Sequence, residues 1–244
     1  MFEKATKMKE KLDTLRPLPS YTVQSIRDKL LLDWTYNSNA IEGNTLTLIE
    51  TKVVLEGITI GGKRLSEHLE VINHKDAIIY VEEIVKSKED LTEWQIKNIH
   101  RLVLKGIDDA NAGQYRKQNV IISGAKHIPP DYLVLKDKMN KFIKWYMSKD
   151  AKEMHPIERA ARVHGDFVKI HPFIDGNGRT ARLLLNLELM KSGYPPIVIK
   201  NSERMRYYEA LDKAHTMGDY TDFIAIVEQE VENSLSIYLN LIDK

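Results

Sequence analysis

The sequence predicts an all-α protein that carries one small β-hairpin. Over most of the 244 residues, apolar side chains recur at three- and four-residue spacing, the pattern of a helix with one buried face. Capping boxes and glycines mark where several of these helices begin and end. Only residues 114–130 depart from the helical pattern, with a β-branched run followed by two prolines. The expected architecture is a bundle of helices with a hairpin between two of them.

Four helices are predicted in the N-terminal half of the chain. Two open with a capping box, Thr47 with Glu50 and Thr92 with Gln95, in which each side chain bonds the backbone N–H of the other residue. Ser20 is the expected N-cap of the first helix. The predicted ranges are about 20–43, 47–57, 66–86 and 92–106, and three of them end at a glycine.

The hairpin and five further helices are predicted in the C-terminal half. In the hairpin, the β-branched residues 120–122 form the first strand, Ser123 and Gly124 form the turn, and residues 125–128 return before two prolines. The five helices are expected at about 131–147, 156–170, 179–190, 202–217 and 221–241. The chain contains no internal repeat and no long linker, so these elements are expected to pack together.

Composition excludes several classes of function. The 36 Lys and Arg residues nearly balance 35 Asp and Glu, so bulk charge cannot drive binding to nucleic acid or to an anionic membrane. Cysteine is absent, which excludes disulfides, a thiolate nucleophile and a cysteine-based metal site. No apolar run reaches the roughly 18–20 residues that span a bilayer, and the charged N-terminus lacks a secretory signal. We expect a soluble cytoplasmic protein with neither nucleic acid nor membrane as a partner.

The segment 171–182, His-Pro-Phe-Ile-Asp-Gly-Asn-Gly-Arg-Thr-Ala-Arg, concentrates groups that can bind phosphate. Its glycines leave backbone N–H groups free at the start of a helix, where the helix dipole favours an anion. Arg179 and Arg182 share a helical face and together can hold the phosphates of one nucleotide. Asp175 suits Mg²⁺ beside those phosphates, and His171 suits a general base. Each group alone is also typical of an ordinary turn or surface, but their combination favours a nucleotide site.

With every fixed position in place, this segment resembles the signature of the Fic family, His-Pro-Phe-x-[Asp/Glu]-Gly-Asn-Gly-Arg-x-x-Arg. The resemblance covers most of the chain and implies the Fic-type helical bundle. It also implies transfer of AMP from ATP to a Ser, Thr or Tyr hydroxyl of a protein. It divides the chain into an N-terminal helical region (1–90), a catalytic core (91–230) and the end of a C-terminal helix (231–244).

The resemblance implies a role for each residue of the signature. His171 would deprotonate the target hydroxyl, Asp175 would hold Mg²⁺ at the α- and β-phosphates, and Arg182 would reach the γ-phosphate. The hydroxyl then attacks the α-phosphorus, and pyrophosphate leaves. His215 stands where relatives often have an Asn beside the base or ribose. The residues expected to contact ATP are Gly176, Asn177, Gly178, Arg179, Thr180, Arg182, Tyr207 and Tyr208, with the two tyrosines near the adenine.

Residues 38–43, Ser-Asn-Ala-Ile-Glu-Gly, match the inhibitory motif of the same family, [Ser/Thr]-x-x-x-Glu-[Gly/Asn]. The resemblance implies that Glu42, carried on the helix over about 20–43, pairs with Arg182 and removes the partner of the γ-phosphate. Ser38 lies four residues earlier on the same helical face and would steady the pair. Alone, the motif is also typical of an exposed helix end. Some relatives with this motif also remove AMP from their target.

The predicted hairpin stands where the family has a flap that binds the target. Its tip residues here are Gly124, Ala125, Lys126 and His127. The expected partners are ATP and a protein target; self-modification and a homodimer are both compatible with the resemblance.

Two other functions fit the same residues. One is a Fic enzyme with another donor, moving UMP or a phosphate group; the complete signature favours AMP. The other is a nucleotide-binding switch without turnover, against which the intact His171 argues. A metal hydrolase fits poorly, because the scattered histidines lack the spacing of metal ligands.

Overall fold

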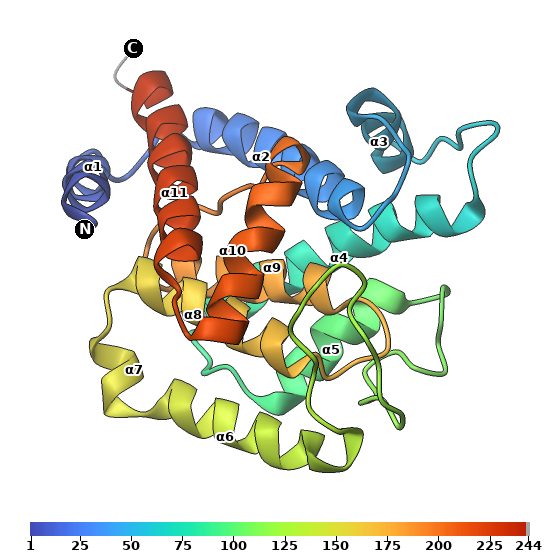
Figure 1. Ribbon diagram of the computed structural model, residues 1–244. Coiled ribbons are helices and arrows are strands. Elements are labelled where there is room, and N and C mark those ends of the chain that lie inside the picture. Colours follow the sequence, from blue (N-terminus) through green and yellow to red (C-terminus); the bar gives the residue numbers. More distant parts are fainter. Residues whose placement is uncertain (243–244) are drawn as a thin grey trace.

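The computed structural model describes residues 1–242, and every regular element among them is helical (Figure 1), as predicted. None of the helices in this range is both long and apolar enough to cross a membrane. The α-helices are α1 Glu3–Thr14, α2 Ser20–Ile41, α3 Leu48–Leu55, α4 Leu65–Ser87, α5 Glu93–Leu104, α6 Leu135–Met147, α7 Lys149–Glu153, α8 Pro156–Ile170, α9 Asn177–Lys191, α10 Arg204–Met217 and α11 Thr221–Ile242. Short 3₁₀ turns precede α6 (Tyr132–Val134) and α10 (Asn201–Glu203).

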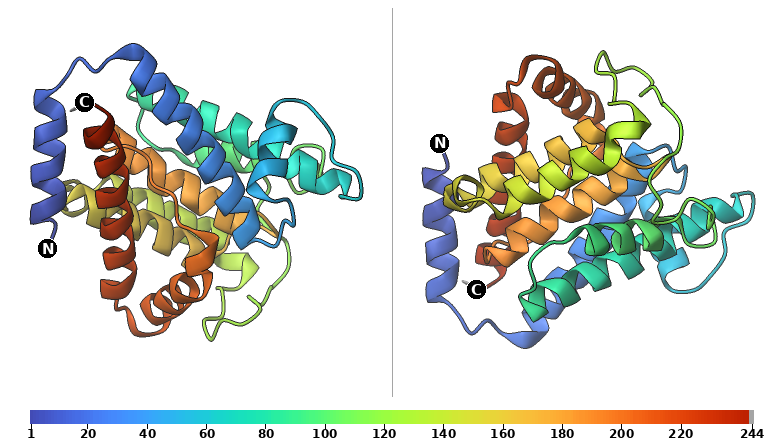
Figure 2. Two further views of the ribbon diagram at one scale, coloured as in Figure 1. Left: turned by 90° about the horizontal axis from the view of Figure 1, so that it is seen from above. Right: turned by 90° about the horizontal axis from the view of Figure 1, so that it is seen from below.

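Helix α9 is the centre of the fold. It packs along α8 and is also contacted by α2, α4 and α5, so nearly all of its residues are buried. Figures 1 and 2 show α8 and α9 side by side through the middle of the molecule, with α2 crossing near the end where α9 begins. The segment 171–182 starts at the turn between α8 and α9 and is therefore anchored in the core.

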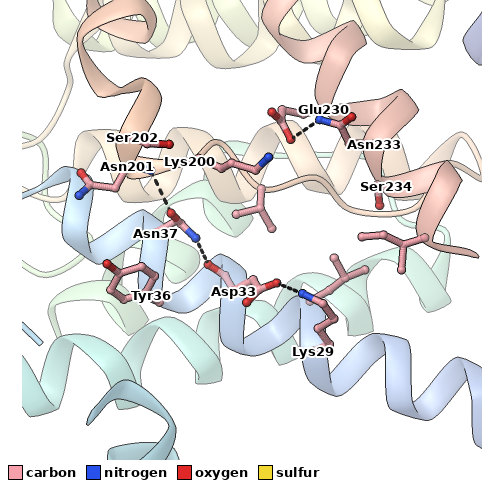
Figure 3. A pocket seen from close by; sticks show the side chains of 13 residues that line it. Lys29, Asp33, Tyr36, Asn37, Lys200, Asn201, Ser202, Glu230, Asn233 and Ser234 are labelled. Atoms are coloured by element: carbon pink, nitrogen blue, oxygen red, sulfur yellow. Dashed lines mark hydrogen bonds and ion pairs between the residues drawn. The ribbon is translucent and has the colours of Figure 1, made fainter. Parts of the chain in front are cut away.

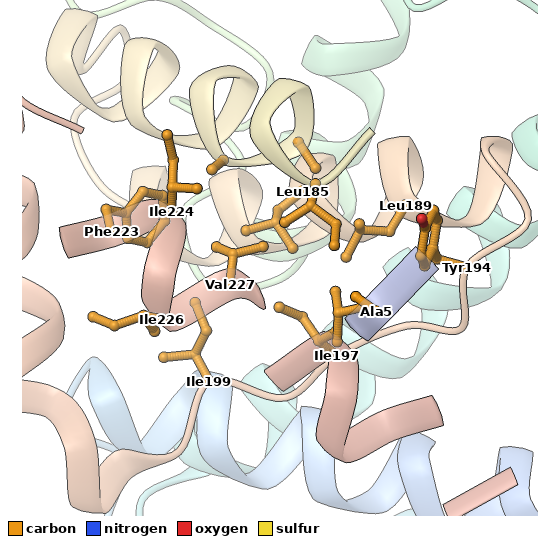
Figure 4. Packing of buried hydrophobic residues seen from close by; sticks show 14 of the residues in the cluster. Ala5, Leu185, Leu189, Tyr194, Ile197, Ile199, Phe223, Ile224, Ile226 and Val227 are labelled. Carbon is orange, nitrogen blue, oxygen red and sulfur yellow. The ribbon is translucent and has the colours of Figure 1, made fainter. Parts of the chain in front are cut away.

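Two large apolar clusters lie on either side of α9. One joins α9 to α1, α8, α10 and α11; Figure 4 shows Leu185 and Leu189 of α9 gathered with Phe223 and Val227 of α11. The other joins α9 to α4, α5, α6 and α8. Each fully buried aliphatic or aromatic side chain contributes roughly 1.5–3 kcal/mol by leaving water, so these clusters hold α9 in place within the bundle.

Most predicted helix boundaries agree with the structure. Both capping boxes, at Thr47 and at Thr92, are formed. The prediction for Ser20 is wrong, because Pro19 takes the N-cap position and no side chain caps α2. Helix α9 starts two residues earlier than predicted, at Asn177, because Gly176 adopts the left-handed N-cap conformation (φ 73°).

The predicted hairpin is wrong. Residues 114–130, called the flap loop below, run between α5 and α6 without forming a strand. Instead of a ladder, the Arg116 guanidinium donates to the Gln118 carbonyl on one arm and to the Pro130 carbonyl on the other. β-Branched residues favour extended backbone, but an isolated two-stranded ladder is marginal, and the two prolines remove donors from one arm.

Candidate active site

His171 lies at the end of α8, at the turn that leads to α9. Its backbone is left-handed (φ 49°), and its N–H donates to the Phe167 carbonyl at 3.1 Å. Burial and the nearby Arg116 guanidinium lower the pKa of His171 to about 4, although the Glu42 carboxylate acts in the opposite direction. The imidazole is therefore neutral at neutral pH, the form that can accept a proton.

Side chains hold the loop before α9 from two directions. Asn177 accepts from the Phe173 N–H at 3.0 Å and donates to the Phe173 carbonyl at 2.9 Å. From α5, His100 Nε2 donates to the Asp175 carbonyl at 2.9 Å, and the His100 ring stacks on Phe173 at 3.6 Å. A Cβ at Gly176 would lie 3.2 Å from His100 Nε2, so glycine is needed there. Because both polar atoms of the Asn177 side chain bond the Phe173 backbone, only the backbone N–H of Asn177 is left to bind an anion.

Arg182 is a buried cation with a partner at every nitrogen; its side chain is 4% exposed. Nη2 donates to Glu42 Oε1 at 2.7 Å and to the Ser38 carbonyl at 2.8 Å. Nε donates to Ser38 Oγ at 3.0 Å, and Nη1 donates to the Tyr207 hydroxyl at 3.3 Å. Burial alone would lower the pKa of Arg182, but Glu42 and Tyr207 outweigh it and raise that pKa above its usual value. The end of α2 is thus joined to α9 through one guanidinium.

The Glu42 carboxylate lies over the first turn of α9. A Cβ on Gly178 would come within 2.1 Å of Glu42 Oε1, so only glycine lets the carboxylate approach this closely. The free N–H groups and the dipole of a helix N-terminus both favour an anion at this position. Glu42 therefore occupies the anion-binding end of α9, where a phosphate group would compete with it.

Arg179 and Asp175 lie on the other side of this turn. The Arg179 side chain is 3% exposed and lies 3.2 Å from Asp175 Oδ2 and 3.4 Å from Glu70 Oε1. Its Nε has no hydrogen-bond partner among residues 1–242, so it keeps a buried donor. Asp175 is 66% exposed and accepts the Gly176 N–H at 2.6 Å. Thr180 is fully buried, and its hydroxyl has no hydrogen-bond partner among residues 1–242.

The two tyrosines expected near adenine occupy different environments. Tyr207 is buried, and its hydroxyl accepts from Arg182 and donates to His164 Nε2 at 2.9 Å. Burial raises the pKa of Tyr207 to about 12, and burial with the Arg182 charge holds the pKa of His164 well below its usual value. Tyr208 is 36% exposed and donates to the Ile41 carbonyl at 3.2 Å. Tyr207 thus supports Arg182 from behind, and only Tyr208 faces outward.

The flap loop is tied to α8 and α10. At its tip, Asp212 Oδ1 accepts from the N–H groups of Lys126 at 2.8 Å and His127 at 3.0 Å. His127 Nε2 donates to the Lys169 carbonyl at 2.8 Å. His215 lies behind, with its ring centroid 5.0 Å from that of His127; burial lowers the pKa of His215 to about 4.

Arg116 ties the root of the flap loop to the histidine. Its Nε donates to the His171 carbonyl and its backbone N–H to the Pro172 carbonyl, both at 2.9 Å. The sequence pattern assigned no site role to Arg116, His100 or Asp212. Each acts on partners 55 to 86 residues away, so no local spacing signals it.

Comparisons with known proteins agree with this geometry. Residues 90–189 match the Fic/DOC family. The protein adenylyltransferase Fic of Nematostella vectensis is 41% identical over 241 residues, which is 97% of this chain and 56% of that protein. The chain spans about half the length of the curated relatives it matches.

Solved structures share both fold and sequence with this chain. Fic-1 of C. elegans has a TM-score of 0.89 and 32% identity, over 99% of this chain and 72% of that one. A Fic domain-containing signalling protein from Bacteroides thetaiotaomicron has a TM-score of 0.90 and 30% identity, over 99% of this chain and 97% of that one. With this identity over nearly the whole length of both chains, and with the signature folded at the start of α9, the chain belongs to the Fic/DOC family.

Proposed function

We propose that the protein is an adenylyltransferase that moves AMP from ATP to a Ser, Thr or Tyr hydroxyl of a protein, and that Glu42 inhibits it. The names of its relatives support the activity. The observation that carries the proposal is the ion pair between Glu42 and Arg182, called the inhibitory pair below, at the start of α9. In this proposal, region 1–90 supplies the inhibitory helix α2 and region 91–230 supplies the transfer machinery.

The chain's own groups account for positioning and proton transfer. The free N–H groups of the first turn of α9 and the buried Arg179 hold phosphate oxygens, which fixes the α-phosphorus for attack. His171, neutral because burial depresses its pKa, accepts the proton of the target hydroxyl. Inhibition follows from competition, because Glu42 occupies the anion-binding turn and the guanidinium that a γ-phosphate would use.

The donor set fits a magnesium ion that arrives with the nucleotide. No cluster of three His, Cys, Asp or Glu side chains suited to a metal occurs within residues 1–242. Asp175 is an exposed carboxylate beside the anion-binding turn, and Mg²⁺ commonly takes one or two carboxylates with phosphate oxygens and water. Asp175 would hold this ion, which supplies neutralisation of phosphate charge when bound.

The flap loop is the proposed docking site of the target. Its two arms form no strand, and the backbone groups of residues 119–121 make no hydrogen bond within residues 1–242, so they stay available for main-chain pairing. Such pairing tolerates many target sequences, and self-modification is included among the proposed targets.

Intact mass after incubation with Mg²⁺ and ATP tests the proposal on wild type, Glu42→Gly and His171→Ala. We expect a gain of AMP units that is larger in Glu42→Gly and absent in His171→Ala. ATP labelled at the α- or the γ-phosphate separates AMP transfer from phosphorylation, and UTP tests UMP transfer. Adding candidate target proteins covers the case in which the chain does not modify itself. Transfer that survives in His171→Ala would remove His171 as the base.

A further inference from the structure

A groove of about 600 Å³ lies between α2, α11 and the segment that leads into α10 (Figure 3). None of the signature residues lines it, so it is separate from the nucleotide site described above. Its volume falls within the range of pockets that hold small molecules. We call it the α2–α11 groove.

Charged side chains of both signs line the groove. Lys29 and Asp33 of α2 form an ion pair on one wall, and Glu230 of α11 lies on the opposite wall. Figure 3 shows the Lys200 side chain extending between these walls. Within residues 1–242, Lys200 has no ion-pair partner, and the Glu230 carboxylate is bonded only by the Asn233 amide, at 3.2 Å. A free ammonium and a carboxylate without a cationic partner therefore face the same space.

The balanced charges of the groove indicate which kind of ligand it can bind. Two lysines and two carboxylates cancel, so a polyphosphate would be repelled by Asp33 and Glu230 as strongly as it is attracted. A small zwitterion fits better, because its ammonium can meet Glu230 and its carboxylate can meet Lys200 by charge-assisted hydrogen bonds. The rest of the lining includes Leu30, Val198 and Ile237, which suit an apolar side chain.

The groove is built on the helix that inhibits the enzyme. Asn37 of α2 bridges the walls by accepting the Asn201 N–H at 2.9 Å, and Asn37 immediately precedes Ser38. A smaller cavity nearby is lined by Trp34, Ser38 and Arg182, so the same stretch of α2 faces the groove and the inhibitory pair. A ligand that bridges α2 and α11 adds contacts only while α2 is docked, and therefore favours the docked state.

We propose that the α2–α11 groove binds a small zwitterion with an apolar side chain, an amino acid or short peptide, and that this ligand strengthens inhibition by Glu42. The proposal of a binding site is argued from the groove alone and does not depend on the proposed function. Its regulatory effect rests on the proposed function.

Calorimetric titration of the full chain with L-leucine, L-phenylalanine and the dipeptide Leu-Leu tests the site. N-acetyl-leucinamide is the matched control ligand, because it keeps the apolar side chain and lacks both charges. We expect binding of at least one zwitterion, none of the control, and about tenfold weaker binding in Lys200→Gln and Glu230→Gln, the loss expected for one charged hydrogen bond. If no zwitterion binds, or if both variants bind like wild type, the site is overturned.

AMP transfer measured with and without the bound probe tests the regulation. We expect the probe to slow wild type, and to leave Glu42→Gly unaffected because it lacks the inhibitory carboxylate. Lys200→Gln and Glu230→Gln should keep the basal rate of wild type and lose the response. A probe that binds without changing the wild-type rate overturns the regulation. If neither wild type nor Glu42→Gly transfers AMP, the proposed function fails, while calorimetry still decides the site.

Discussion

Replacing Glu42 by Gln removes the charge of the inhibitory pair while keeping nearly the same bulk. Glu42 is the C-cap of α2 and is followed by a glycine with positive φ. Glu56 offers a matched control, because it is the C-cap of α3 and also precedes a glycine with positive φ. Within residues 1–242 its carboxylate has a single ion-pair partner, Lys52, at 3.9 Å. Any effect of Glu42→Gln that Glu56→Gln does not share belongs to the inhibitory pair rather than to a helix end.

The geometry sets the size of the effect. Glu42 Oε1 lies 2.7 Å from Arg182 Nη2, with the Arg182 side chain 4% exposed and the Glu42 side chain 34% exposed. A hydrogen bond between charged groups is worth about 1.5–3 kcal/mol, and the partial exposure of Glu42 favours the lower end. About 1.5 kcal/mol corresponds to roughly tenfold in an equilibrium, so Glu42→Gln should raise the rate of AMP transfer about tenfold, and Glu42→Gly by at least as much.

Initial rates of AMP incorporation from α-labelled ATP measure the release, and calorimetry in a His171→Ala background measures ATP affinity without turnover. We expect Glu42→Gln to be faster than wild type and to bind ATP more tightly, and Glu56→Gln to match wild type in both. Folding should be little affected, because Ser38 and Tyr207 still hold Arg182. A Glu42→Gln protein with wild-type rate and wild-type ATP affinity would refute competition between this carboxylate and phosphate.

Three further outcomes follow from the contacts. With a pKa of about 4, His171 stays unprotonated well below its ordinary pKa of 6.5, so protonation of His171 should lower kcat/KM only near pH 4. The same shift makes the free energy of unfolding decrease as pH falls from 6.5 towards 4, because the unfolded chain takes up the proton first. Asp212→Ala should raise the KM for the target several-fold with ATP affinity unchanged and with faster hydrogen exchange at Lys126 and His127, while Asp212→Asn, which keeps an acceptor oxygen, should lie between. His100→Phe keeps an aromatic ring against Phe173 but loses the partly buried bond to the Asp175 carbonyl and the buried bond from the Gly113 N–H. Chemical denaturation should therefore show a free energy of unfolding lower by about 1–3 kcal/mol for each bond.

Local sequence signals predicted most of the helices, because they act within a few residues. The capping box at Thr47 needs only Glu50 three positions later. The start of α9 needs only a glycine at 176, which adopts positive φ without strain. The signature 171–182 is local in the same sense, since the N–H groups at the start of α9 and both arginines lie within a short loop and the helix turns that follow it. Family resemblance added the expected meeting of Glu42 and Arg182, which no spacing along the chain indicates.

The remaining site residues depend on contacts that only the fold creates. Asp212 reaches the flap loop from 86 residues away, and His100 reaches the Asp175 carbonyl from 75 residues away. The hairpin prediction failed for the same reason, because a β-branched run specifies extended backbone but not a partner. Tyr207 stands at the expected position, but its side chain lies inside the protein and supports Arg182. The sequence position of an aromatic residue therefore did not predict its environment.

The contacts of Arg182 bear on how the proposed inhibition would be relieved. Besides Glu42, two residues hold Arg182: Ser38, through its hydroxyl and its carbonyl, and Tyr207, which is itself anchored on His164. Glu42, by contrast, projects from the end of α2 with a third of its side chain in solvent. The two halves of the inhibitory pair therefore differ in burial. Release needs a shift of the last turn of α2 that moves Glu42 away from α9, and Tyr207 then keeps the guanidinium in place to meet a phosphate.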